Sequence, residues 1–137
     1  MSFVIDASIA GAWLLRDEAT GATEGLLDRL ETEPAIAADL LRHEVRSLVL
    51  TAVRRGRLVA NELPAIFRRF EALPLRINGP GETAFVVALA ERRGLSAYDA
   101  AHLALALSER RPLATLDRKL RAAAAAEGVT ALPDDPR

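Results

Sequence analysis

The chain has 137 residues, half of them apolar and 27% charged, which is the size and balance of one globular domain. It contains no cysteine, which excludes disulfides, thiolate metal sites and cysteine nucleophiles. The longest apolar run, residues 84–90, is too short to cross a bilayer, and the chain starts without a basic leader. We therefore expect a cytoplasmic protein with no membrane contact.

The net charge of −1 conceals an uneven distribution. Residues 1–39 carry two arginines against eight acidic residues, a net charge of −6, whereas residues 40–69 carry seven arginines against two glutamates, a net charge of +5. Arginine outnumbers lysine seventeen to one, which genomic base composition explains on its own. The basic middle of the chain nevertheless offers a surface for phosphate groups.

Short apolar runs alternate with longer helical patterns along the chain. Strands are expected at residues 3–5, 35–37, 75–77, 113–115 and 129–131, and helices, caps included, at 8–15, 22–30, 39–55, 61–72, 82–93, 96–109 and 117–127. The expected N-caps are Asp39, Asn61, Ser96 and Asp117. This alternation predicts an α/β fold, a parallel sheet with helices on both faces. No glycine-rich loop follows the first strand, which argues against nucleotide-binding folds of that kind.

Two acidic residues follow predicted strands. Asp6 comes directly after the first strand, and Asp117 follows the fourth strand across a single residue. Taken alone, each is more typical of a helix cap or an Asx turn. Ligands of parallel sheets, however, bind beyond the carboxyl ends of the strands, and neighbouring central strands would bring these two carboxylates close together.

Two further acidic residues lie on predicted helices. Asp99 fits a capping box with Ser96, but its helix is apolar on nearly every face, so we expect its first turn to face the sheet edge. Glu44 borders an apolar stripe formed by Leu41, Val45, Leu48, Val49 and Ala52. A solvated helix-edge glutamate is the ordinary interpretation, although a partly buried carboxylate would need a partner such as a metal ion.

As a set, we expect the four carboxylates to form a cage of oxygen ligands whose charges repel one another, a repulsion that a divalent cation would relieve. Mg²⁺ and Mn²⁺ prefer such ligands. Either ion lowers the pKa of a bound water, which then acts as a nucleophile. A zinc or iron site built on His43 and His102 is less favoured, because no HxH or HxxxH spacing occurs. His102 shares a helix face with Asp99, which leaves a general-base role open beside simple packing.

Four segments carry these acids in order: Phe3-Val4-Ile5-Asp6-Ala7-Ser8, then Leu41-Arg42-His43-Glu44-Val45, then residues 96–106, then residues 113–120. Together they resemble the PIN-domain ribonucleases, and their length and style are similar to the VapC toxins of bacterial toxin–antitoxin pairs. The resemblance runs from residue 3 to about residue 131 and is strongest in Tyr98-Asp99-Ala100-Ala101 and Ala114-Thr115-Leu116-Asp117. It implies a single PIN domain over residues 1–137, with a parallel sheet of four to five strands in the order 3-2-1-4-5.

The resemblance implies an endoribonuclease dependent on Mg²⁺ or Mn²⁺ that cleaves a phosphodiester by water attack, leaving a 5′-phosphate and a 3′-hydroxyl. The catalytic and metal-holding acids would be Asp6, Glu44, Asp99 and Asp117, and Ser8 and Thr115 would hydrogen-bond to carboxylates. Candidate RNA contacts, chosen by proximity to the acids, are Arg42, Arg46, Arg118 and Lys119, with solvated helix faces as the alternative. The implied substrate is transfer or ribosomal RNA.

The resemblance also implies two protein partners. One is a small antitoxin of the VapB kind, with a helix in an apolar groove and a basic side chain among the carboxylates. The other is a second copy of the chain, for which apolar surface is expected at Trp13, Leu26, Phe67 and Phe70, positions that would otherwise be core. The alternative function is a PIN-fold scaffold that binds RNA or protein without cutting, although a scaffold has no need of four like charges.

Overall fold

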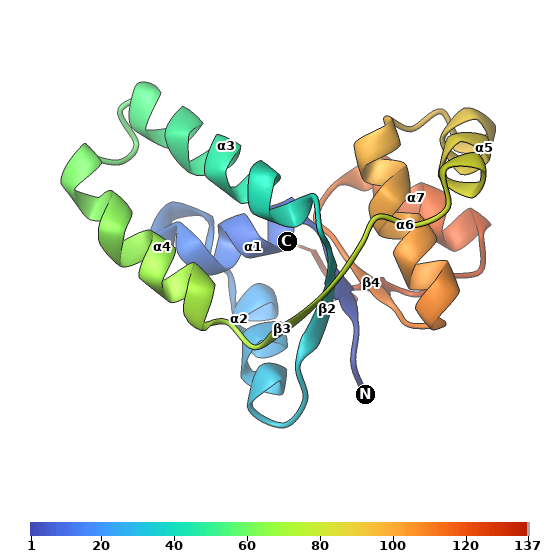
Figure 1. Cartoon of the computed structure of the whole chain (residues 1–137). Helices are drawn as coiled ribbons and strands as arrows, with labels where there is room; N and C mark the ends of the chain where they lie inside the picture. Colours follow the sequence, from blue (N-terminus) through green and yellow to red (C-terminus); the bar gives the residue numbers. More distant parts are fainter. Residues whose placement is uncertain (137) are drawn as a thin grey trace.

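The computed structural model of the chain describes residues 1–136 and shows a five-stranded sheet between two groups of helices (Figure 1). The strands are β1 (Val4–Ile5), β2 (Ala35–Ala38), β3 (Leu75–Asn78), β4 (Leu113–Ala114) and β5 (Ala131–Leu132). All neighbours pair in parallel, in the order β3-β2-β1-β4-β5. The predicted α/β class and strand order are therefore confirmed.

Helices connect the strands: α1 (Ala7–Leu14), α2 (Gly21–Asp28), α3 (Leu41–Arg54), α4 (Leu63–Ala72), α5 (Thr83–Arg93), α6 (Ala97–Glu109) and α7 (Arg118–Ala126). Short 3-10 turns are η1 (Arg16–Glu18), η2 (Arg29–Glu31) and η3 (Ala60–Glu62). Helices α1 to α4 lie on one side of the sheet and α5 to α7 on the other (Figure 1). The strand order reverses between β1 and β4, which is where ligands of open parallel sheets usually bind.

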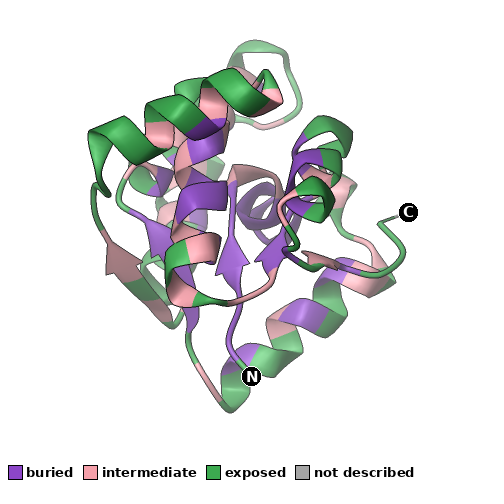
Figure 2. Cartoon of the chain, turned by 90° about the vertical axis from the view of Figure 1, so that its right-hand side faces the viewer, coloured by how far each residue is buried: buried purple, intermediate pink, exposed green. Residues whose placement is uncertain are grey.

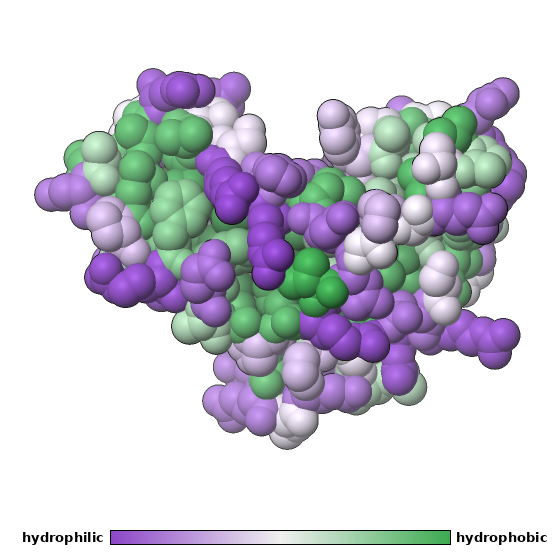
Figure 3. Space-filling view, in the orientation of Figure 1, coloured by the Kyte–Doolittle hydropathy of each residue, from purple (hydrophilic) through white to green (hydrophobic). Residues whose placement is uncertain are grey.

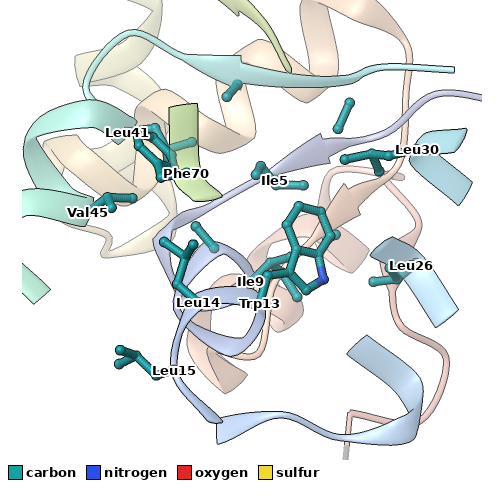
Figure 4. Close-up of a cluster of buried hydrophobic side chains, with 14 of the residues drawn as sticks. Ile5, Ile9, Trp13, Leu14, Leu15, Leu26, Leu30, Leu41, Val45 and Phe70 are labelled. Atoms are coloured by element: carbon teal, nitrogen blue, oxygen red, sulfur yellow. The ribbon is translucent and has the colours of Figure 1, made fainter. Parts of the chain in front are cut away.

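The alternation of side chains along each strand divides the core into two clusters. Ile5 of β1 faces α1 to α4, whereas its neighbour Val4 faces α5 to α7. In the first cluster, Ile9 and Trp13 of α1 pack near Ile5, and Leu41 of α3 lies beside Phe70 of α4 (Figure 4). Strands β1, β2 and β4 are buried, the edge strands β3 and β5 are less so, and the outer helix faces are exposed (Figure 2).

Two predicted N-caps are wrong. Helix α3 begins after Leu40 and not after Asp39, and α4 begins after Glu62 and not after Asn61; neither observed cap makes a side-chain hydrogen bond to its helix. The Asp39 N–H donates to the carbonyl of Asn78 at 2.8 Å, which continues the pairing of β2 with β3 by one residue. Asn61 lies within η3, so a 3-10 turn delays the start of α4.

The other two predicted caps are confirmed. The Ser96 hydroxyl accepts the N–H of Asp99 at 3.1 Å, and a carboxylate oxygen of Asp117 accepts the N–H of Leu120 at 2.9 Å. Gly94 ends α5 with a φ of +65°, a backbone conformation that favours glycine. The fifth strand begins two residues later than predicted, at Ala131.

The predicted apolar surface at Trp13, Leu26 and Phe70 is wrong, because all three side chains are buried in the first core cluster. Phe67 is half-buried against the same cluster. The Trp13 indole N–H donates to the carbonyl of Thr23 at 2.8 Å, which satisfies its one polar atom inside the core. Within residues 1–136, no helix combines the length and apolar character needed to span a membrane.

Candidate active site

Asp6 is held rigidly where β1 passes into α1. One carboxylate oxygen accepts the N–H groups of Ser8 at 3.0 Å and Ile9 at 3.2 Å, and also the Ser8 hydroxyl at 2.6 Å. The other oxygen accepts the Thr115 hydroxyl at 2.5 Å. Burial raises the pKa of Asp6, and the hydrogen bonds from Ser8 and Thr115 oppose that rise.

The same two hydroxyl groups join the ends of β1 and β4. The Ser8 hydroxyl accepts the N–H of Leu116 at 2.9 Å, and the Thr115 hydroxyl accepts the N–H of Asp117 at 3.1 Å. Asp117 in turn caps α7. The network therefore places Asp6 and Asp117 at one sheet edge, although they are far apart in the sequence.

Asp99 occupies the first turn of α6 and is partly buried. Its carboxylate accepts no hydrogen bond from the residues that the structure describes. Burial raises the pKa of Asp99, and the negative charges of Asp117, Asp6 and Glu44 raise it further, while His102 lowers it. Asp99 is thus near enough to the other three acids to be repelled by their charges.

Glu44 lies in the first turn of α3, with its side chain 26% exposed. One of its carboxylate oxygens, Oε1, lies 2.6 Å from Nε2 of His102, a fully buried side chain of α6. Because a carboxylate can only accept, Nε2 is the donor. The sequence gives little sign of this contact: 58 positions separate the two residues, on helices from opposite sides of the sheet. The one sequence feature that hints at this contact is a histidine in an almost wholly apolar helix, three residues after Asp99.

A cavity of about 480 Å³ opens beside Glu44 and Ser8, between α1 and α3. Figure 3 shows the surface hollowed at the top of the view, between the two groups of helices. Glu18 and Arg57 also line this cavity, and the Arg57 guanidinium contacts Glu18 at 2.6 Å and Asp17 at 2.9 Å, so these two carboxylates are already paired.

The candidate RNA-binding side chains are all exposed and flank the acids from two helices. Arg42 and Arg46 lie on α3 beside Glu44, where Arg46 approaches Nδ1 of His43 at 3.5 Å. Arg118 and Lys119 lie in the first turn of α7, directly after Asp117. These cations form no ion pair with another described residue, so phosphate groups can reach them.

Among residues 1–136, no three Asp, Glu or His side chains are placed to hold one metal ion together. The chemistry nevertheless fits a hard divalent ion, because the half-buried Asp99 carboxylate has acidic neighbours and no hydrogen-bond donor. Mg²⁺ keeps several of its waters in proteins, so it does not require three direct protein ligands.

Comparison with known proteins identifies the family. A model described as the PIN domain matches residues 3–126. The chain belongs to the PIN-domain family. Over 127 residues this PIN domain is 32% identical to Ribonuclease VapC3 of Pyrobaculum aerophilum, an alignment that covers 88% of this chain and 92% of that protein.

Two solved structures show the same fold. The protein PAE2754 of Pyrobaculum aerophilum superimposes on this PIN domain with a TM-score of 0.75 and 20% identity, covering 96% of this chain and 90% of that one. A chain from VapBC2 of Rickettsia felis, bound to a DNA fragment from their promoter, gives a TM-score of 0.68 and 15% identity, covering 96% and 97%.

Proposed function

We propose that this PIN domain is an endoribonuclease toxin of the VapC kind that requires Mg²⁺ or Mn²⁺ and works in the cytoplasm. The observation that supports the proposal is the surroundings of Asp99: burial raises the pKa of its carboxyl, and the negative charges of Asp117, Asp6 and Glu44 raise it further. The similarity to Ribonuclease VapC3 over most of both chains supports the same activity.

Each acid has a role suited to its surroundings. Asp6, Asp99 and Asp117 would hold the cation, directly or through water, and Glu44 would hold it or orient the attacking water. When bound, the cation supplies an acidified water and stabilises negative charge on the phosphate. Cleavage would leave a 5′-phosphate and a 3′-hydroxyl.

We propose single-stranded loops of transfer or ribosomal RNA as the substrate. Arg42 and Arg46 on α3, with Arg118 and Lys119 on α7, would contact phosphates on the two sides of the acids. Contacts of this kind hold the RNA backbone without reading its sequence, whereas unpaired loop bases are open to side-chain recognition.

Two partners accompany this proposal. A VapB-like antitoxin would insert a helix and a basic side chain at the cavity beside Glu44, because a cation there opposes the repulsion among the acids. A homodimer would use the apolar side chains that the fold leaves exposed on α5 and at the start of α6, namely Phe85, Val87 and Tyr98. The VapBC2 structure is a precedent for the first partner.

The decisive experiment uses the purified chain freed of any partner. Single-stranded RNA should be cleaved with Mg²⁺ or Mn²⁺, left intact with excess EDTA, and left intact by Asp99→Asn under both conditions. Cleavage that survives exhaustive chelation would contradict the proposed chemistry. RNA binding without cleavage in either metal would favour the alternative, a non-catalytic scaffold.

A further inference from the structure

His102 is buried at this sheet edge, and the roles proposed for the four acids do not explain why a histidine stands there. It lies in α6, which packs against β1 and β2, and its side chain is fully buried. Nε2 donates to Oε1 of Glu44 at 2.6 Å. The other ring nitrogen, Nδ1, is buried and has no hydrogen-bond partner among the described residues.

Packing alone does not explain a histidine at this position. A buried ring nitrogen without a partner is unfavourable, and an apolar ring of similar shape would fill the same space without that cost. The flanking residues of α6, Leu103 and Ala104, are apolar and belong to the second core cluster. The hydrogen bond to Glu44 is therefore the feature that distinguishes histidine from phenylalanine here.

A general-base role does not fit either. Nε2 already donates to Glu44, and Nδ1 is closed off from solvent. A general base must come within hydrogen-bond distance of the proton that it removes, directly or through one water. With neither nitrogen available to substrate or solvent, His102 acts through the carboxylate that it contacts.

The hydrogen bond from His102 holds only one of the two carboxylate oxygens of Glu44. Oε1 is held by His102, whereas Oε2 accepts no hydrogen bond from any residue in the described part of the chain. A free glutamate side chain on a helix surface samples many rotamers, and fixing one of its oxygens removes most of that freedom. By contrast, both oxygens of Asp6 are held, by Ser8, Ile9 and Thr115.

We propose that His102 is a positioning residue: its Nε2–H holds Oε1 of Glu44 across the sheet edge and leaves Oε2 to face the cation or the attacking water. This inference rests on the proposed nuclease function and deepens it. Partners that orient metal-binding side chains are commonly important to the site, and removing one typically costs about 10- to 100-fold in metal affinity or activity.

Two substitutions separate this role from packing. His102→Phe keeps the ring shape and removes the donor, whereas the amide nitrogen of His102→Gln can replace Nε2 as a donor to Glu44. His43→Gln is the matched control for metal binding, since His43 adjoins Glu44 in sequence but is exposed and contacts Arg46 instead. Titration calorimetry measures the Mn²⁺ affinity of each variant. Cleavage assays give kcat and KM separately. Urea unfolding without metal measures the stability of the fold.

We expect His102→Phe to unfold at a urea concentration no lower than the parent, to bind Mn²⁺ at least about 10-fold more weakly and to lose a similar factor in kcat with little change in KM. His102→Gln should recover most of both losses, and His43→Gln should bind Mn²⁺ like the parent. If His102→Phe binds Mn²⁺ and cleaves like the parent, the inference is wrong while the proposed function stands.

The hydrogen bond itself has a spectroscopic test that needs neither metal nor RNA. Long-range ¹H–¹⁵N correlation spectra of the parent should show His102 with its proton on Nε2. A proton on Nδ1 alone would overturn the inference, even if His102→Phe failed to fold. A parent protein that neither binds Mn²⁺ nor cleaves RNA would refute the proposed function and this inference together.

Discussion

The substitution Thr115→Val tests the network that holds Asp6. Valine has nearly the shape of threonine but lacks the hydroxyl, which donates to Asp6 at 2.5 Å and accepts the N–H of Asp117 at 3.1 Å. Thr115 is fully buried and Asp6 is nearly so, so water cannot replace the lost donor easily. The substitution should therefore lower the free energy of unfolding.

The size of this loss follows from the two bonds. A hydrogen bond to a charged group contributes about 1.5–3 kcal/mol, and a neutral one about 1 kcal/mol. The expected loss at pH 7 is about 2–4 kcal/mol, out of a typical total of about 5–15 kcal/mol. For a domain of this size that corresponds to a fall in Tm of roughly 8–16 °C.

Urea unfolding of the parent and of four variants would measure this loss; the variants are Thr115→Val, Thr115→Ser, Asp6→Asn and the double variant Asp6→Asn/Thr115→Val. Thr115→Ser keeps the hydroxyl and should lose only about 1 kcal/mol, for one buried methyl group. In an Asp6→Asn background the cost of Thr115→Val should shrink, because the hydroxyl no longer meets a charge. Equal stabilities of Thr115→Val and Thr115→Ser, or a cost that Asp6→Asn leaves unchanged, would refute the reasoning.

Four further predictions concern the acids and the surface. Mn²⁺ at a hundred times its dissociation constant should raise the free energy of unfolding of the parent by about 2.7 kcal/mol, and urea curves of Asp99→Asn should show much less stabilisation at the same concentration. Without metal, Asp99→Asn should be at least as stable as the parent at pH 7, because it removes a repelled charge; a marked loss would argue against a self-repelling cluster. Because the pKa of Asp99 is raised in the folded state, the folded state binds more protons than the unfolded state between pH about 3.8, the ordinary value, and the raised pKa. The free energy of unfolding contributed by Asp99 therefore falls as the pH rises through that window. Urea midpoints of parent and Asp99→Asn should converge below that window, and a constant difference across it would contradict the assignment. Val87→Glu should convert a dimer to a monomer in sedimentation velocity, whereas a parent that is already monomeric at micromolar concentration would exclude the dimer.

The strands and helices could be predicted because local patterns determine them. Apolar runs bounded by Pro, Gly and acidic residues gave the strands, and their alternation with helices implied the parallel sheet. The caps at Ser96 and Asp117 followed from local hydrogen bonding within one turn. The cap predicted at Asp39 failed because β2 continues its pairing with β3, a neighbour that the local sequence does not reveal.

Burial was harder to predict than secondary structure. Trp13 lies on a helix covered by both α3 and α4, so nearly every face of α1 is inside, and a helical pattern cannot show that. Helix α5 is the opposite case: its apolar side chains Phe85 and Val87 remain exposed. Which apolar face finds a neighbour depends on how the layers pack.

The sequence by itself determined which residues end the strands and open the helices, and so which acids are candidates for a common site. Only the tertiary structure decided which remote side chains touch: Thr115 with Asp6 between neighbouring strands, and His102 with Glu44 across the sheet edge. The physical reason is how far apart in the sequence the interacting residues lie. Backbone conformation and capping depend on residues a few positions apart. The Thr115–Asp6 bond forms only when β1 and β4 pair, and the His102–Glu44 bond forms only when helices from opposite faces of the sheet meet at its edge.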